Sequence, residues 1–341
     1  MRSALGFLAR RLALAVLVVL GVSLLIFILA RIMPGDPARL ALGPAATPDQ
    51  VAELRQQMGL DQPLFAQYAT FLKNALHFDF GVSLYTDRPV AADIADTFPA
   101  TLELILIAGL TMGIIGIGLG IASARFRDGG IDNGSRLFAL LCVAMPNFVW
   151  ALLLMLLASY WLGVLPIAGR LSDGITPPPD VTGMMTVDAL IAGRPDVFWD
   201  ALWHLVLPGL ALALPGLAQL ARLARTSMVD SYARPFVEFA RAYGISEWLI
   251  ASKYALRPAS IPVLTILGMQ VVALLGSAFL IESVFMWPGM ARYGVQAILR
   301  KDLNAIIAVA TLTSVCFVSF NMLVDAAVVL IDPRIRHQGS A

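Results

Sequence analysis

Six apolar stretches, each long enough to cross a lipid bilayer, constrain this chain more than any other feature. A helix needs about 20 apolar residues to span the hydrocarbon core. Such runs occur at residues 10–30, 101–124, 137–161, 203–221, 260–284 and 305–331. Because lipid offers the backbone no hydrogen-bond partner, each run predicts a helix. We therefore expect an all-α integral membrane protein with six transmembrane helices, of which the fourth is the weakest because Pro208 and Pro215 interrupt it.

The composition agrees with a membrane protein. Of the 341 residues, 59% are hydrophobic and only 14% are charged, whereas soluble domains carry about 25% charged residues. A net charge of +1 without a basic tail gives no indication of nucleic-acid binding. Cys142 and Cys316 lie in apolar runs without a second cysteine or histidine nearby, so we expect buried small side chains there and no metal site or disulfide.

Arginine placement predicts the orientation of the spans. Positive residues favour the cytoplasmic side of a membrane protein. Arginines precede the first span and follow the second, fourth and sixth, whereas the loop 31–100 on the opposite side is rich in aspartate. Both termini are therefore expected in the cytoplasm.

The two long outer loops differ in their expected structure. In the first, Thr47 and Pro48 suit the start of a short helix over 48–58. A second helix is expected within 63–81, lying along the membrane surface, with aromatic side chains packed on the bundle or the interface. The second loop, 162–202, contains three consecutive prolines and several glycines, so no regular helix is expected there.

Glycines in the second span recur at intervals that allow helix backbones to approach closely. The main interpretation is packing within the bundle, and the alternative is an interface with another subunit. The residues concerned are Gly109, Gly113, Gly116, Gly118 and Gly120.

The chain offers no recognisable catalytic or nucleotide site. None of the three lysines follows a glycine, so the phosphate-binding loop G-x-x-x-x-G-K-[ST] is absent from the sequence. The three histidines are scattered, with no metal-binding or nucleophile pattern. We expect no catalytic residues, no cofactor and no metal.

Three carboxylates lie within the apolar spans, where charge is functional by default. Glu103 and Glu282 are within a turn or two of an interface, where water is expected to reach them. Asp325 is the one fair candidate for a proton-coupled carrier, although it lies near the cytoplasmic end of its span. All three are kept as possible pathway residues or structural polar groups.

The longest charged segment that could form helices between two apolar runs extends from about Leu220 to Leu264 and is rich in arginine. Within it, Ala240 and Gly244 are four residues apart, which on a helix would place both on one face and form a notch for a partner's side chain. Gly244 also suits a turn between two short helices. Arg234, Arg241 and Lys253 are expected to contact an acidic partner surface.

This segment resembles the EAA loop of ABC importer permeases, through Glu238-x-Ala240, Gly244, Leu256 and Pro262. In that family the loop docks as a coupling helix into a cleft of the ATPase subunit. Two departures are Phe239, where the general pattern has alanine, and Arg257, where it often has proline. Motifs of the branch that imports di- and oligopeptides, nickel or glutathione occur in order at 31–37 (RIMPGDP), 58–63 (MGLDQP), 80–83 (FGVS), 99–103 (PATLE), 165–169 (LPIAG), 282–289 (ESVFMWPG) and 332–336 (DPRIR).

The resemblance implies the type I importer permease fold with a cytoplasmic EAA coupling helix, in a bacterial inner membrane. Its expected parts are residues 1–95 (first span and outer loop), 96–331 (five-span core with a coupling loop at about 225–258) and 332–341 (cytoplasmic tail). The coupling residues would be Glu238, Ala240, Arg241, Gly244 and Leu256. The implied partners are a second homologous permease, two ATP-binding-cassette ATPase subunits, which bind the ATP, and an extracytoplasmic solute-binding protein. Peptides are the first expectation for the solute, with nickel, glutathione and glycosides as alternatives.

A rival interpretation is a gradient-driven secondary transporter or channel that acts alone. It predicts transport by the purified chain without partners. A simple membrane anchor is a third possibility, but an anchor would not need interrupted helices or a long basic segment.

Overall fold

A computed structural model describes residues 2–32, 37–42, 45–57 and 59–331 of the chain, and these residues form helices and loops without a strand. The expected tail at 332–341 and motif residues 33–36 and 58 lie outside them. The chain divides into two compact units, one of Met1–Pro99 with Gly289–Val318 and the other of Ala100–Pro288 with Ser319–Ala341.

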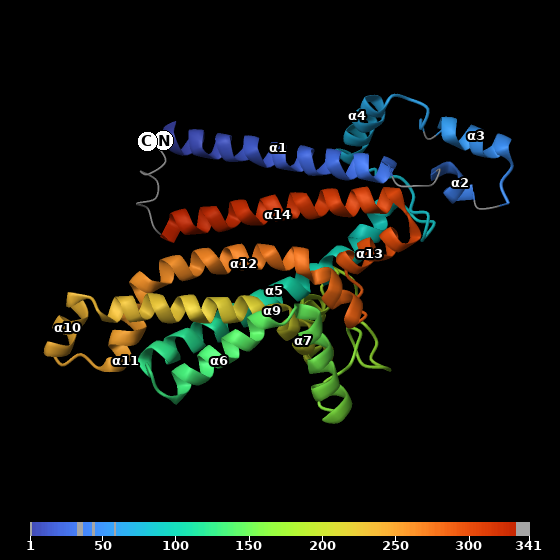
Figure 1. Ribbon diagram of the computed structural model, residues 1–341. Helices are drawn as coiled ribbons and strands as arrows, with labels where there is room; N and C mark the ends of the chain where they lie inside the picture. Colours follow the sequence, from blue (N-terminus) through green and yellow to red (C-terminus); the bar gives the residue numbers. More distant parts are fainter. Residues whose placement is uncertain (1, 33–36, 43–44, 58, 332–341) are drawn as a thin grey trace. The chain divides into compact units, whose positions relative to one another are not determined.

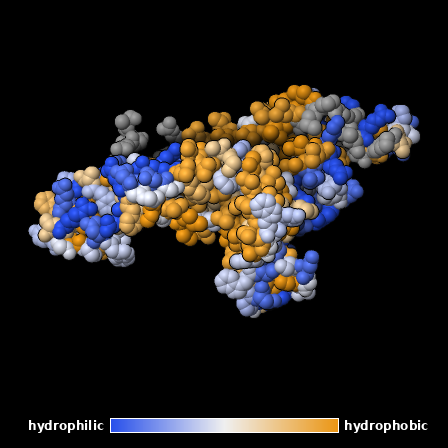
Figure 2. Space-filling model, turned by 60° about the horizontal axis from the view of Figure 1, so that its bottom comes forward, coloured by the Kyte–Doolittle hydropathy of each residue, from blue (hydrophilic) through white to orange (hydrophobic). Residues whose placement is uncertain are grey.

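Five long helices dominate the described chain (Figure 1): α1 (Arg2–Ile32), α5 (Val90–Arg125), α9 (Pro195–Tyr232), α12 (Leu256–Val284) and α14 (Leu303–Ile331). Each contains a segment long and apolar enough to cross a membrane, and a bent pair of shorter helices raises the number of candidate spans to six. Hydrophobic residues gather over the middle of the face seen in Figure 2, and many hydrophilic ones lie at its left end, where α10 and α11 are.

The predicted third span is not one continuous helix. It consists of α6 (Gly130–Ala144) and α7 (Asn147–Leu154), which continues as a π-helical turn over Met155–Trp161, with a bend of 109° between the two parts. The break falls at Met145, whose backbone is extended (φ −114°, ψ 139°). Pro146 explains the break, because a proline disfavours helical geometry in the residue before it.

The predicted fourth span is one continuous helix, although its two prolines made it the weakest of the six predictions. α9 has 38 residues and passes through Pro208 and Pro215 without a break. Pro208 is buried, and α9 packs against α6, α7, α8 and α12. A proline inside a helix leaves a backbone carbonyl without its usual hydrogen bond. Such a helix is tolerated where neighbouring helices pack against it and offer that group other partners.

The glycines of α5 allow close packing within the chain. A Cβ at Gly109 would lie 3.0 Å from Val271 of α12, and one at Gly116 would lie 3.1 Å from the Leu217 carbonyl oxygen of α9. A Cβ at Gly120 would overlap Ala224. The first interpretation of the glycine pattern is confirmed at these positions, whereas a Cβ at Gly118 would meet nothing within 4 Å.

The first unit contains the short helices α2 (Pro37–Leu42), α3 (Pro48–Gln57), α4 (Leu64–Ala75) and α13 (Met290–Arg300). The predicted start of α3 is confirmed, because Thr47 and Gln50 exchange hydrogen bonds between side chain and backbone at 3.0 and 3.4 Å. On α4, Tyr68 and Phe71 pack against Phe27 of α1, at ring-centroid distances of 5.4 and 6.0 Å. The expected packing of aromatic residues is confirmed for these two.

The loop 162–202, for which no regular helix was expected, contains a helix that the sequence did not predict. α8 (Met185–Ile191) follows the proline-rich stretch, and α9 already begins at Pro195. The Asp188 carboxylate accepts hydrogen bonds from Thr182 N–H (2.8 Å), Thr182 Oγ1 (2.7 Å) and Gly183 N–H (3.0 Å). The new helix thus lies within residues 184–192, a stretch without proline or glycine, and Asp188 ties the preceding loop back onto it.

Candidate functional site

A helical hairpin, residues 233–255, joins α9 to α12 and projects at the left of Figure 1. It consists of α10 (Pro235–Ala242), α11 (Glu247–Leu249) and a π-helical turn (Ile250–Ala255) that continues into α12 without a break. Only Ala233 and Arg234 separate α9 from α10. The hairpin is thus attached directly to two long helices.

Gly244 forms the turn of the hairpin, as the sequence predicted. Its backbone has φ +73°, a region that glycine adopts without steric penalty. The Ile245 N–H donates to the Ala240 carbonyl (3.1 Å) and the Gly244 N–H to the Arg241 carbonyl (2.9 Å). This pair of bonds is the Schellman arrangement, which satisfies the last carbonyls of a helix.

The predicted notch at Ala240 and Gly244 is wrong. α10 ends at Ala242, so Gly244 lies in the turn and does not share a helical face with Ala240. Ala240 is only 5% exposed and packs with Val237 and Ile250 in the small core of the hairpin. The small side chain serves this internal packing and leaves no opening for a partner.

The exposed surface of the hairpin is aromatic instead. Phe239 is 66% exposed, Tyr243 84% and Trp248 76%. Sequence reasoning noted Phe239 only as a departure from a motif and gave the other two no role. The available signal was three large aromatic residues within ten positions of a segment otherwise rich in charge. Exposed aromatic groups of this size bury a large area when a partner covers them.

Arg241 is held within the hairpin. Its Nε lies 2.7 Å from Glu247 Oε1 across the turn, and this hydrogen bond is the main cause of a raised pKa of the Arg241 guanidinium. Glu238 is exposed on α10. Arg241 therefore braces the turn, whereas the sequence assigned it to a partner.

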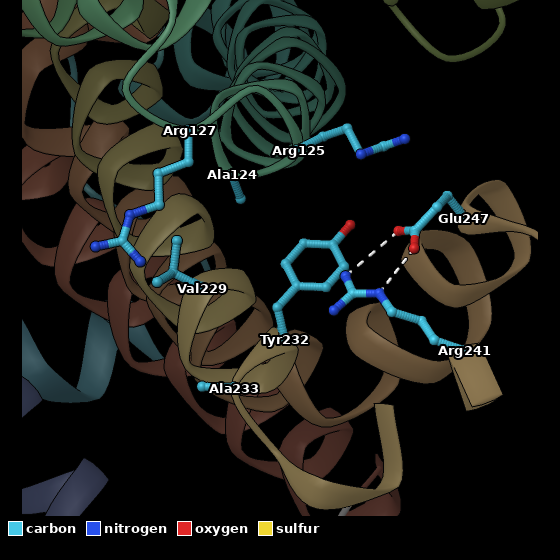
Figure 3. Close-up of a pocket in the computed structure, with 8 residues that line it drawn as sticks. All are labelled: Ala124, Arg125, Arg127, Val229, Tyr232, Ala233, Arg241 and Glu247. Atoms are coloured by element: carbon cyan, nitrogen blue, oxygen red, sulfur yellow. Dashed lines mark hydrogen bonds and ion pairs between the residues drawn. The ribbon is translucent and has the colours of Figure 1, made fainter. Parts of the chain in front are cut away.

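A pocket of about 280 Å³ lies between the hairpin and the ends of α5 and α9 (Figure 3). Arg125, Arg127 and Tyr232 line it together with the Arg241–Glu247 pair. The Tyr232 hydroxyl has no hydrogen-bond partner among the described residues. Leu256, predicted as a coupling residue, is half-buried beside this region in a cluster with Ala124, Met228, Ala255 and Ala259. Leu256 supports the base of the hairpin and is not on its exposed face.

Glu103 is buried at the opposite end of α5, contrary to the expectation that water reaches it. Its side chain is 2% exposed, and its carboxylate lies 2.6 Å from Arg170 Nη2. It also accepts hydrogen bonds from Thr186 N–H (2.7 Å) and Thr186 Oγ1 (2.6 Å). Arg170 in turn donates to the Gly183 carbonyl (2.9 Å). We call these four residues the Glu103 clasp, which ties the loop 162–202 to α5.

Glu282 is also fully buried, again contrary to expectation. Its carboxylate accepts a hydrogen bond of 2.6 Å from Thr101 Oγ1 and thereby joins the end of α12 to α5. The Trp287 indole strengthens the same junction by donating to the Ala100 carbonyl (2.9 Å). Asp325 is half-buried on α14. Glu103 and Glu282 therefore have evident structural roles.

Comparison with known proteins identifies relatives over nearly the whole chain. Residues 116–337 match the family described as binding-protein-dependent transport system inner membrane component, and residues 4–105 match the N-terminal family of the same components. The probable D,D-dipeptide transport system permease protein DdpB of Escherichia coli (strain K12) is 42% identical, with 95% of each chain covered. The di/tripeptide transport system permease protein DppB of Pseudomonas aeruginosa (strain UCBPP-PA14) is 40% identical, with 98% of this chain and 99% of the relative covered.

Proposed function

This chain belongs to the family of binding-protein-dependent transport system inner membrane components, and we propose that it is a permease subunit of a peptide importer. Family membership makes it a transport subunit of the inner membrane, not an enzyme, within a system that includes ATPase and solute-binding partners. The names of the relatives, which refer to dipeptides and di/tripeptides, support peptides as the solute. Nickel, glutathione and glycosides are the alternatives.

The exposed aromatic surface of the hairpin is the observation that carries the proposed coupling mechanism. Phe239, Tyr243 and Trp248 project from a hairpin whose own core is too small to bury them. A partner that covers them gains hydrophobic free energy and grips a rigid element. We assign this surface to the ATPase subunit, whose movement on binding and hydrolysing ATP would tilt α9 and α12.

The proposed assembly contains this chain, a second permease of similar fold, two ATPase subunits and one extracytoplasmic solute-binding protein. The hairpin and both termini face the cytoplasm, as the arginine distribution favours. ATP is bound by the ATPase subunits. The coupling residues are Glu238, Arg241 and Gly244 with the three aromatic residues, while Ala240 and Leu256 support them from within.

Isolation of the native complex tests this proposal. The tagged chain is solubilised gently from its membranes, and the co-purifying proteins are identified and quantified by mass spectrometry. We expect two ATPase subunits and one second permease for each copy of this chain. A chain that is isolated alone and still moves solute in liposomes would show a gradient-driven transporter or channel.

Reconstituted transport tests the solute. The complex in liposomes, supplied with its binding protein and ATP, should accumulate a labelled dipeptide. Unlabelled dipeptides should compete, whereas glutathione and Ni²⁺ should not. Competition by glutathione or Ni²⁺ alone would contradict a peptide solute.

A further inference from the structure

A pair of amide side chains within the spanning part of the second unit is hydrogen-bonded to itself, and neither side chain has another partner among the described residues. We propose that Gln219 of α9 and Gln270 of α12 line the translocation pathway and bind the main-chain amides of the passing solute. This inference rests on the proposed function and names residues that would contact the peptide.

The burial pattern of α9 singles out Gln219. From His204 to Ala221, all of which the structure describes, α9 exposes no other residue. The two helices approach closely here, because a Cβ at Gly216 would lie 3.8 Å from the Gln270 Cβ. Gln270 Nε2 donates a hydrogen bond to Gln219 Oε1. Between His204 and Ala221, α9 therefore presents an amide at its single exposed position.

The single bond between the two amides leaves most of their capacity unused. A carboxamide offers two N–H donors and two acceptor lone pairs, and no further bond to either side chain occurs among the described residues. An amide group transferred from water to an apolar medium without compensation costs roughly 2–7 kcal/mol. Lipid is therefore an unfavourable neighbour for this pair, and polar groups inside a membrane domain generally face the bundle interior or a water-filled cavity. Because Gln219 is exposed in this chain, we assign it to a cavity.

The polar character continues along the same face of α9. Arg222 and Thr226 follow Gln219 at helical spacings of three and seven residues, and both are exposed. Arg222 has no carboxylate partner among the described residues. Gln219, Arg222 and Thr226 thus form a polar stripe that leads from the amide pair toward the hairpin end of α9. The stripe carries one positive charge, that of Arg222, about a turn beyond Gln219.

Small residues on α12 leave space beside the pair. Ala273 is exposed, and a Cβ at Gly276 would meet nothing within 4 Å. Both lie one to two turns from Gln270 along the helix. An extended chain could therefore pass the amides without a steric barrier from these positions.

The chemistry of the stripe matches a peptide backbone. A carboxamide donates and accepts hydrogen bonds as a peptide bond does, so it can replace the hydration of any peptide bond regardless of the neighbouring side chains. The Arg222 guanidinium suits a terminal carboxylate, with which it can form two parallel hydrogen bonds. Such a lining selects for the main chain and tolerates different side chains.

Thiol labelling tests the placement without any assumption about the solute. In the intact complex, Gln219→Cys is treated with a charged, water-soluble methanethiosulfonate, and Ile114→Cys, on the apolar and 73% exposed face of α5, is the matched control. The parent chain, with Cys142 and Cys316, gives the background. We expect Gln219→Cys to react at least tenfold faster than Ile114→Cys. Equal, background-level labelling of both would overturn the proposal, because it would place Gln219 against lipid or protein.

Transport measurements test the role of the pair. The double variant Gln219→Leu/Gln270→Leu should keep its partner subunits and its ATP hydrolysis but take up a labelled dipeptide at least tenfold more slowly. Unchanged uptake, or loss of the second permease from the purified complex, would overturn the proposal, the latter in favour of a subunit contact. If the parent complex accumulates no dipeptide, the proposed solute is wrong, while rapid labelling of Gln219→Cys still supports a water-filled pathway.

Discussion

The Glu103 clasp, which ties a loop to α5, and the hairpin, which joins α9 to α12, place their polar and apolar side chains in opposite ways. In the clasp, a buried carboxylate, a guanidinium and a hydroxyl satisfy one another across 83 residues of sequence. In the hairpin, three buried aliphatic residues form the core, and the largest apolar side chains remain outside. The buried polar groups of the clasp find partners within this chain, apart from Arg170 Nε, which has none among the described residues, whereas the aromatic surface of the hairpin is left uncovered.

From this difference we expect the clasp to hold one fixed arrangement and the hairpin to be the part that a partner moves. Buried ion pairs with good geometry fix one arrangement and are strongly destabilised when one partner is lost. A small hairpin on two helix ends has little internal stability of its own, but it is short and continuous with α12. We therefore expect a displacement of the hairpin to be passed on to α12. The predictions below test this contrast, from the largest expected effect to the smallest.

Removal of the clasp carboxylate should have the largest effect on stability. Glu103→Leu leaves Arg170 buried without its counterion, which costs about 3–5 kcal/mol. The measurement is the unfolding temperature of the purified chain in detergent. The double variant Glu103→Leu/Arg170→Met should be less destabilised than Glu103→Leu alone. If the effects of the two substitutions simply add, the clasp is not a coupled pair.

Overfilling the core of the hairpin should have a smaller effect that stays local. Ala240→Leu places a larger side chain between Val237 and Ile250 and should cost about 1–3 kcal/mol. Faster hydrogen exchange confined to residues 233–255 is the expected signature. Ala242→Leu is the matched control, since Ala242 is exposed on the same helix. Equal effects of the two substitutions would contradict a packed core at Ala240.

Substitution of the turn glycine should cost less again. Gly244→Ala forces a Cβ into the left-handed region, at about 1–2 kcal/mol, although the surrounding space is open. Gly244→Asn should be milder, because asparagine tolerates that region. ATP-driven uptake should follow the same order, parent above Gly244→Asn above Gly244→Ala. A more active Gly244→Ala than Gly244→Asn would argue against a backbone role.

Loss of the ion pair across the turn should have the smallest effect. Both Arg241 and Glu247 are substantially exposed, and exposed pairs contribute about 0.2–1 kcal/mol. Arg241→Gln should therefore lower the unfolding temperature slightly, and high salt should reduce the difference from the parent. A large loss of ATPase binding with unchanged stability would instead mean that Arg241 contacts the partner directly.

Sequence patterns predicted the helical spans because span length and apolar content follow directly from bilayer thickness. They could not separate Pro146, which ends a helix, from Pro208, which lies inside one, because the difference depends on what packs against each position. They also could not predict the partners of Glu103, since Arg170 and Thr186 come from a loop far along the chain.

At the hairpin, local chemistry was enough for the turn at Gly244 but not for the docking surface. The expected notch assumed one continuous helix from Ala240 to Gly244, whereas the positive φ of Gly244 ends that helix. Which small residue is buried and which aromatic residue is exposed depends on how α10 folds back on Ile250, and that contact is tertiary.

The central claim is that the aromatic surface of the hairpin binds the ATPase. The most direct test replaces Tyr243 and Trp248 with aspartate and quantifies the ATPase that co-purifies with the tagged chain, with Phe65→Asp on α4, another exposed aromatic position, as control. Each lost anchor should cost at least about 2 kcal/mol of binding. We predict that the variant loses its ATPase and keeps the second permease, while the control keeps both. Parental amounts of ATPase, together with unchanged ATP-driven uptake, would contradict the account.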